Sequence, residues 1–294
     1  EMDYHDLEKW AGAAYLLSLV LSTLVLFVGA SINGSRRWLS LGPLSFQPSE
    51  FAKPAVILFL ARTISRREKK KKGMLELFRT LVLILPIVGL VGTSNLSTAV
   101  IILGIAVILV FVSSPFYLPF VGLFGAGAGF MGIFLGLESY RLERIAIWRD
   151  PESYEKGFQT IQGLYAIGSG GLFGTGLGGS IQKLGFVPEA QNDMIFSIIC
   201  EELGLVGAGI LLLLFLMLIW RFFLVSVHAP DLLGSLIAAG VMGHISIQVI
   251  LNVAVVTNTI PNTGITLPFV SYGGTSILFL LAEMGLVLGI SRKC

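Results

Sequence analysis

The sequence has few charged residues. Only 13% of its 294 residues are Asp, Glu, Lys or Arg, whereas 54% are hydrophobic. A soluble domain carries roughly a quarter charged residues, so the composition excludes a soluble globular protein and predicts an all-α, polytopic helical membrane protein. The net charge of +2 indicates little, because the distribution of charge in a membrane protein matters more than its sum.

Cysteine and histidine are scarce as well. The two cysteines, Cys200 and Cys294, lie in a predicted span and at the last position, which makes them a poor disulfide pair. The sequence has no Cys-x-x-Cys motif and no cluster of His and Cys, so a metal–thiolate site is not indicated. The three histidines are scattered, at His5, His228 and His244, and we expect structural roles for them.

Eight apolar runs approach the 20 or so residues that cross about 30 Å of hydrocarbon. They lie at about residues 10–31, 47–65, 77–92, 95–113, 116–137, 193–220, 232–257 and 272–290. Each predicts a transmembrane helix. The polar stretch from Gly92 to Thr98 predicts a tight turn between two of these helices.

The basic residues predict the orientation. Eight of the 20 Lys and Arg residues lie in or near the loop after the second run: Arg62, Arg66, Arg67, Lys69, Lys70, Lys71, Lys72 and Arg79. Short basic loops stay in the cytoplasm. By alternation, the external segments are residues 32–46, 93–95, 138–192 and 258–271. The same alternation places three further basic residues inside, which agrees with this orientation: Arg221, Arg292 and Lys293. Binding of the lysine run to anionic lipid or to a partner is an alternative explanation for its charge.

One external segment, residues 138–192, is long and basic. Its basic residues are Arg141, Arg144, Arg149, Lys156 and Lys183, and Arg36 and Arg37 add charge from the first external loop. Two explanations stay open for this positive charge. One is contact with lipid headgroups, and the other is capture of an anionic, phosphate-bearing substrate, for which Arg is well suited.

The segment from Gly168 to Gly204 combines a glycine-dense loop with carboxylates. An apolar helix follows Asp193, and Glu201 and Glu202 lie about two turns inside it. Ionisable groups are costly there and mark a site, a pathway or a buried pair. The glycines resemble those of a dinucleotide-binding loop, but no βαβ unit surrounds them. We therefore expect a close-packed loop that lies on helix ends.

Polar side chains in other runs predict packing contacts. Glu50 and Lys53 are one helical turn apart, and we expect them to form a buried pair that fixes helix packing. Asn252 and Ser246 are expected to hydrogen-bond between helices. Residues 258–274 are too rich in Pro and Gly for a helix, and such backbone near membrane depth needs protein or a cavity beside it. We expect this segment to form a second wall of one outward-facing site.

The chain resembles the SEDS family, the group of FtsW, RodA and SpoVE, and is more similar to FtsW and SpoVE than to RodA. The matching motifs are Asn33 to Trp38, Phe46 to Lys53, Tyr140 to Arg144, Leu164 to Gly171, Gly176 to Lys183, Pro188 to Phe196, Glu201 to Gly204 and Pro261 to Gly274. The resemblance covers essentially the whole chain, and we treat residues 1–294 as one SEDS membrane domain. The family usually has ten spans, and the sequence begins at Glu1 without an initiator methionine, so we expect a piece of a longer protein that holds the last eight.

The resemblance implies a peptidoglycan glycosyltransferase of the bacterial cytoplasmic membrane. It would polymerise lipid II, the undecaprenyl-pyrophosphate-linked disaccharide-pentapeptide, at an active site facing outside. The implied partners are a class B penicillin-binding protein, which is a transpeptidase, and other wall-synthesis proteins of division or sporulation. A divalent metal, Mg²⁺ or Mn²⁺, is implied, whereas no organic cofactor and no nucleic-acid partner are expected.

The resemblance also assigns roles to residues. The family's essential acidic residue maps onto Asp193, and glycosyl transfer needs a base near the acceptor hydroxyl. The residues expected to bind substrate are Arg36, Arg37, Trp38, Arg141, Arg144, Gln182 and Lys183. Glu201 lies about 12 Å from Asp193 along a helix, so Glu201 and Glu202 are expected to be structural. Glu189 is a candidate metal ligand.

Two other classes of protein remain as alternatives. A transporter, such as a flippase for the same lipid precursor, would favour a midplane site, broken helices and inverted repeats. No internal repeat is evident, and the polar groups collect at the predicted outer face. A non-catalytic scaffold for the transpeptidase would need the same helix packing but would have no need of Asp193.

Overall fold

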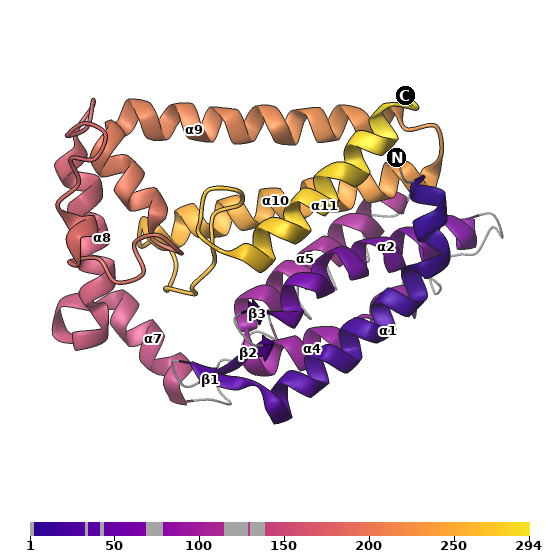
Figure 1. The fold of residues 1–294 in the computed structure, drawn as a ribbon, viewed down its shortest axis with the longest axis horizontal. Coiled ribbons are helices and arrows are strands. Elements are labelled where there is room, and N and C mark those ends of the chain that lie inside the picture. Colours follow the sequence, from indigo (N-terminus) through magenta and orange to yellow (C-terminus); the bar gives the residue numbers. More distant parts are fainter. Residues whose placement is uncertain (1–2, 33–34, 42–43, 69–78, 115–128, 130–138) are drawn as a thin grey trace. The chain divides into compact units, whose positions relative to one another are not determined.

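The computed structural model describes residues 3–32, 35–41, 44–68, 79–114, 129 and 139–294, which are predominantly helical (Figure 1). The chain divides into two compact units. The first unit consists of Glu1–Tyr117, Ile219–Ile247 and Gly274–Cys294, and the second unit of Leu118–Leu218 and Gln248–Gly273. The predicted helical class is confirmed.

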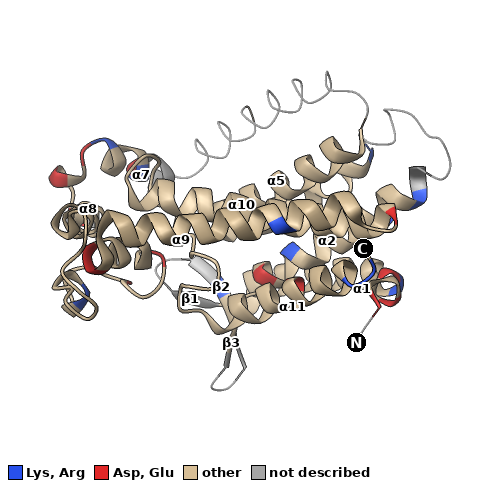
Figure 2. Ribbon diagram, turned by 90° about the horizontal axis from the view of Figure 1, so that it is seen from above, with Lys and Arg blue, Asp and Glu red and all other residues tan. Residues whose placement is uncertain are grey.

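Five helices in the described ranges are long and apolar enough to cross a membrane. They are α1 (Tyr4–Val28), α5 (Leu96–Ser113), α9 (Ile195–His228), α10 (Leu232–Val256) and α11 (Gly274–Ser291). Most of the helical ribbon is uncharged, and the charged residues gather mainly toward helix ends and connections (Figure 2). These helices coincide with five of the eight predicted spans.

The other three predicted spans differ from one another. The run 47–65 forms α2 (Pro48–Glu68), which carries several charged side chains. The run 77–92 corresponds to a shorter apolar helix over Arg79–Ser94, whose last ten residues are α4 (Leu85–Ser94). The run 116–137 lies, apart from residue 129, outside the described residues. The total of eight spans therefore stays a prediction.

The predicted tight turn near residue 95 is confirmed. Asn95 lies between α4 and α5, and its side-chain oxygen accepts a hydrogen bond of 3.2 Å from the backbone N–H of Thr98. Asn is a favourable residue at this position because it satisfies an N–H group that the first helical turn leaves without a partner.

The first predicted external loop contains a small sheet. Strands β1 (Ala30–Ile32), β2 (Ser35–Leu41) and β3 (Leu44–Phe46) are antiparallel and lie in the order β1-β2-β3. Ala30 pairs with Trp38, and Leu39 pairs with Phe46. The sheet was not predicted, because strands of three residues are too short to show a clear alternating pattern.

The first unit is a packed helical core. Helix α2 packs against α1, α5 and α11, and aliphatic side chains such as Ile57, Leu60 and Ile102 are fully buried. Gly240 of α10 lies so close to α2 that an added Cβ would come within 2.7 Å of the Ile57 side chain. Small residues at such contacts let helices approach closely in membranes.

Two pairs of ionisable side chains lie inside this core. Lys53 Nζ donates to Glu50 Oε2 over 2.9 Å, and His244 Nδ1 lies 2.7 Å from Glu283 Oε2. All four side chains are buried, Glu283 completely. The expected Glu50–Lys53 contact is therefore present, whereas the pairing of His244 with a buried carboxylate was not anticipated from the sequence.

The second unit contains ordered helices within the predicted external segment 138–192. These are α7 (Ser139–Arg149), the short 3-10 helices η1 (Pro151–Ser153) and η2 (Glu155–Gly157), α8 (Phe158–Gly170) and η3 (Gln182–Leu184). The first part of α9 follows them. The predicted long loop thus contains several helices as well as irregular parts.

Helix α9 is kinked at Gly204, where the short first part turns into the long second part (Figure 1). The backbone of Gly204 has φ 65° and ψ −169°, a conformation that L-residues rarely adopt. An added Cβ would lie 2.4 Å from the backbone N of Gly174 and 2.5 Å from the carbonyl O of Leu172. Glycine is therefore required both for the kink and for the close approach of the loop.

Candidate functional site

Asp193 lies at the end of a non-helical segment directly before α9, in the second unit. The neighbouring Met194 is buried, whereas Asp193 itself is partly exposed. Just upstream, the carbonyl oxygen of Gln191 accepts a hydrogen bond of 2.9 Å from the N–H of Tyr272. The segment is thus tied to the chain that precedes α11.

A glutamine of α8 holds one oxygen of the Asp193 carboxylate. Gln159 Nε2 lies 3.4 Å from Asp193 Oδ1 and 3.2 Å from the carbonyl O of Pro188. Its other side-chain atom, Oε1, accepts a hydrogen bond of 3.2 Å from Asn262 Nδ2. Because both ends of the amide are engaged, the orientation of Gln159 toward Asp193 is fixed.

A buried asparagine of α10 holds the backbone of Asp193. Asn252 Nδ2 donates to the carbonyl O of Asp193 over 2.9 Å and to that of Ile265 over 2.7 Å. The expectation of a bond between helices is corrected, because both acceptors lie outside helices. Ser246, expected to act similarly, donates instead to Met242 O of its own helix over 2.7 Å, a common alternative for serine.

The Pro- and Gly-rich segment 258–273 lies against Asp193. Trp148 Nε1 donates to Asn258 O over 2.9 Å, and Arg144 Nη1 donates to Asn262 O over 3.0 Å. Gly264 has φ 68°, and an added Cβ there would lie 3.7 Å from Asp193 Oδ2. The segment therefore forms a wall beside the carboxylate, as the sequence suggested.

The surroundings of Asp193 raise its pKa to about 6. Burial is the largest cause, and the negative charge of Glu189 acts in the same direction. The positive charge of Arg144 and the hydrogen bond from Gln159 lower the pKa and oppose these effects. A carboxylate with such a pKa is mostly ionised at neutral pH but can accept a proton readily, which suits a general base.

Glu201 and Glu202 hold the Gly-rich loop. Glu201 accepts from the Ser180 hydroxyl and, over 3.0 Å, from the N–H of Ile181. Glu202 accepts from the N–H of Gly178 over 3.0 Å and pairs with Lys183 Nζ at 2.5 Å. These contacts give both glutamates a local structural task, and they occupy the ammonium group of Lys183.

The other predicted site residues belong to several different elements. Arg36, Arg37 and Trp38 lie on β2 in the first unit, where Arg37 Nε donates to Ser94 O over 2.7 Å and Trp38 is half-buried. Arg141 lies on α7, and Gln182 lies in η3. Arg144 is the one predicted cation that the described contacts place beside Asp193.

Sequence reasoning missed Gln159 and Asn262. Their partners are separated by 34 and 103 residues along the chain, so no local spacing links them. The available signal was weak, because Gln159 is one of several polar residues near the start of α8.

The described residues contain no group of three His, Cys, Asp or Glu side chains that could hold a metal ion. Mg²⁺ commonly binds through one or two carboxylates together with substrate phosphates, and Glu189 close to Asp193 fits that pattern. Glu189 has a positive φ of 55°, and its carboxylate accepts from Asn192 Nδ2.

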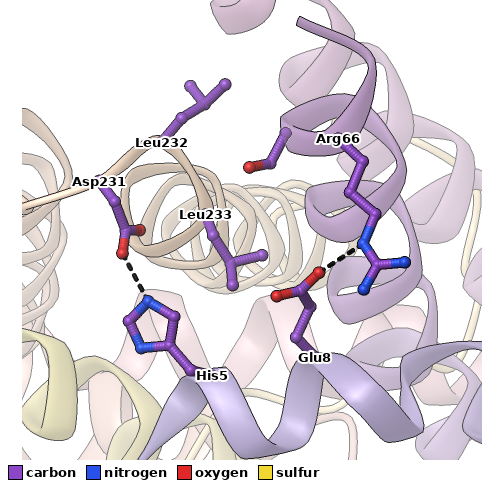
Figure 3. A pocket seen from close by; sticks show the side chains of 7 residues that line it. His5, Glu8, Arg66, Asp231, Leu232 and Leu233 are labelled. Atoms are coloured by element: carbon purple, nitrogen blue, oxygen red, sulfur yellow. Dashed lines mark hydrogen bonds and ion pairs between the residues drawn. The ribbon is translucent and has the colours of Figure 1, made fainter. Parts of the chain in front are cut away.

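A separate pocket of about 530 Å³ lies in the first unit (Figure 3). Its lining is His5, Glu8, Ser65, Arg66, Asp231, Leu232 and Leu233. His5 points toward Asp231 at 2.8 Å, and Arg66 pairs with Glu8 at 2.7 Å. None of the residues expected to act on substrate lines this pocket.

Known proteins resemble this chain along nearly its whole length. The model of the FtsW/RodA/SpoVE family, described as cell cycle protein, matches residues 1–294. Stage V sporulation protein E of Bacillus subtilis (strain 168) is 41% identical over 307 residues, covering 99% of this chain and 81% of that protein. A probable peptidoglycan glycosyltransferase FtsW of Haemophilus influenzae is 38% identical over 295 residues, covering 97% of this chain and 74% of that protein.

Solved structures agree with this assignment. The rod shape determining protein RodA of Thermus thermophilus has a TM-score of 0.73 at 33% identity and is covered to 81%. A chain from a structure on the coordination of polymerization and crosslinking by a peptidoglycan synthase complex has a TM-score of 0.81 at 33% identity and is covered to 83%. Both alignments include 99% of the present chain. The protein is a multi-pass membrane protein that belongs to the FtsW/RodA/SpoVE family, as its motifs suggested.

Proposed function

We propose that this protein is a peptidoglycan glycosyltransferase that polymerises lipid II, with Asp193 as its general base. The observation that carries the proposal is a carboxylate with a pKa near 6 that is hydrogen-bonded by Gln159, on a backbone that is held by Asn252. Relatives at 33% and 38% identity that are named probable peptidoglycan glycosyltransferases support the substrate class.

In the proposed reaction, the acceptor hydroxyl loses its proton to the Asp193 carboxylate while its oxygen bonds to the anomeric carbon of the donor sugar. The bond from that carbon to the pyrophosphate oxygen breaks, and the lipid pyrophosphate leaves with both electrons. Gln159 holds Oδ1 and leaves Oδ2 directed toward the space beside Gly264. Protonated Asp193 is returned to its ionised form by water, because its pKa lies below neutral pH.

The leaving pyrophosphate needs positive charge. Arg144 is exposed and close enough to Asp193 to lower its pKa, which supports a role for its guanidinium beside the leaving group. A bound Mg²⁺ or Mn²⁺ would neutralise developing charge on the pyrophosphate, and Glu189 is the side chain that would hold it. The proposal also includes an active site that faces outside. It further includes a class B penicillin-binding protein as partner, which is supported by the peptidoglycan synthase complex among the structural relatives.

The decisive experiment compares the wild-type protein with Asp193→Asn. Purified protein, with its transpeptidase partner, labelled lipid II and Mn²⁺, is assayed for glycan strands on a gel. We expect strands from the wild type and a loss of at least about 100-fold in the variant, because general bases typically contribute 10²–10⁴-fold. Asparagine has nearly the same size and shape as aspartate, so we expect the variant to fold normally. A thermal unfolding measurement checks this.

Near wild-type polymerisation by folded Asp193→Asn would reject Asp193 as the base. Transport of labelled lipid II into the other leaflet without any strands, by both proteins, would favour a flippase. Transpeptidase activation by both proteins without strands would favour a scaffold.

A further inference from the structure

The loop from Gly171 to Val187 exposes large apolar side chains. Leu172, Phe173 and Leu177 are 61%, 80% and 84% exposed. Ile181, Leu184 and Phe186 are also at least half exposed. A contiguous apolar surface of this kind on a folded protein marks contact with a membrane, a ligand or another protein.

The exposed side chains belong to a backbone that is fixed in place. The N–H groups of Thr175 and Gly176 donate to the carbonyl oxygens of Glu201 and Glu202 over 2.9 and 3.0 Å. An added Cβ at Gly174 would lie 2.1 Å from Glu202 O, so the loop is packed directly on the helix. The apolar side chains are therefore held outward and do not face the core.

This loop joins the start of a membrane span. The N–H groups of Leu205 and Val206 donate to the carbonyls of Gly171 and Leu172 over 2.9 and 3.1 Å. The part of α9 after Gly204 contains about 24 residues and is roughly 36 Å long, enough to cross the hydrocarbon core. Leu205 and Val206 are themselves 67% and 47% exposed. The apolar surface of the loop thus continues that of the span.

We propose that Leu172, Phe173 and Leu177 insert into the interfacial region of the lipid bilayer and anchor the loop beside α9. The tip from Gly171 to Gly179 contains no charged residue, and much of its backbone is hydrogen-bonded to α9, as a region poor in water requires. Protein interfaces obtain most of their energy from Trp, Tyr and Arg, whereas this tip offers Leu and Phe. Lipid is therefore the occupant that the chemistry favours.

The insertion is measured with a nitroxide spin label at Leu177→Cys, in a protein that also carries Cys200→Ala and Cys294→Ser. The labelled protein is placed in lipid nanodiscs of phosphatidylcholine and phosphatidylglycerol. Collisions with oxygen, which partitions into lipid, are compared with collisions with a water-soluble nickel chelate. The matched control is a label at Glu152→Cys, an exposed position of η1 in the same unit.

We expect the Leu177 label to collide several-fold less often with the nickel chelate than the Glu152 label, and more often with oxygen. Equal access of the chelate to both labels would overturn the proposal. Protection at Leu177 that arises only after a penicillin-binding protein is added would also overturn it and assign the surface to protein. A label at Phe173→Cys, measured separately, guards against a local disturbance at one position. The outcome is independent of glycan synthesis, so it does not depend on the role of Asp193.

Discussion

At the scale of the residue, the pKa of the Asp193 carboxylate is set by opposing effects of its surroundings. Burial and Glu189 raise its pKa, while Arg144 and the Gln159 amide lower it. The balance at about 6 lies just below neutral pH, where a base is ionised but still basic enough to take a proton. Small changes around this group therefore have measurable consequences.

We expect glycan synthesis to depend on pH through Asp193. Because the base must be ionised, the rate should fall as the pH drops below about 6, approaching a tenfold loss per pH unit. Initial rates with labelled lipid II between pH 5 and pH 8.5 measure this profile. A rate that stays constant from pH 7 to pH 5 would contradict ionised Asp193 as the base.

Replacing Gln159 by leucine should slow the reaction and move its pH profile to higher pH. The variant loses the hydrogen bond that lowers the Asp193 pKa, so a smaller fraction of the base is ionised at pH 7. We expect a loss of roughly two- to tenfold at pH 7, because a hydrogen bond to a charged group is worth about 1.5–3 kcal/mol, and partial recovery at pH 8.5.

Gln162→Leu is the control for this substitution. Gln162 lies three residues further along α8, and its side chain makes no hydrogen bond in the described part of the chain. An unchanged pH profile in Gln159→Leu, or an equal shift in Gln162→Leu, would argue against a positioning role for Gln159.

At the scale of the element, the kinked α9 and the Gly-rich loop form one structure. Glu201 and Glu202 lie just before the kink and bind loop N–H groups, while Leu205 just after it donates to Gly171. The loop therefore depends on the backbone conformation of Gly204. A change there acts on the loop and on the helix together.

Gly204→Ala should loosen the loop and destabilise the protein. The new Cβ would meet backbone atoms at about 2.4–2.5 Å, and the positive φ adds strain of about 1–3 kcal/mol. Hydrogen exchange across residues 171–187 should rise, and the thermal midpoint should fall. Gly209→Ala is the matched control, because a Cβ at Gly209 meets no atom within 4 Å, so its exchange should stay at the wild-type level.

The sequence predicts some elements and not others. The long apolar runs and the Asn95 turn follow from hydropathy and from one capping residue. The kink does not, because a single glycine is tolerated inside a helical pattern and gives no sign of its φ angle. The three-stranded sheet was missed because β1 and β3 have only three residues each.

The site shows the same limit. The sequence places Asp193 before an apolar helix and a Pro- and Gly-rich segment near the end of the chain, but it gives no distance between them. The contact is made by Asn252, which bonds Asp193 and Ile265 from a third element. Such three-body contacts depend on tertiary packing, which periodicity does not describe.

At the scale of the whole molecule, buried ionisable side chains inside the first unit are notable because the helices are otherwise apolar. His244 and Glu283 join α10 to α11, and Glu50 and Lys53 form a pair within α2. Removing charges from water is expensive, so each group depends on its partner. We expect these pairs to determine which faces of the helices in this unit pack against each other.

His244→Ala should therefore destabilise the protein by about 3–5 kcal/mol, because it leaves the fully buried Glu283 without its partner. The double variant His244→Phe with Glu283→Leu removes both groups and should be distinctly more stable than His244→Ala. Unfolding in detergent, followed by circular dichroism against temperature or denaturant, measures both. A single variant as stable as the wild type would show that the contact contributes little.

Gly204 also constrains how this chain can change over generations. Every amino acid that one nucleotide change can put in place of glycine carries a Cβ atom, and the backbone of Leu172 and Gly174 leaves no room for one. No conservative missense variant is therefore available at this codon. In a deep mutational scan, position 204 should tolerate synonymous changes alone, whereas Gly209, five residues further along the same helix, should accept alanine.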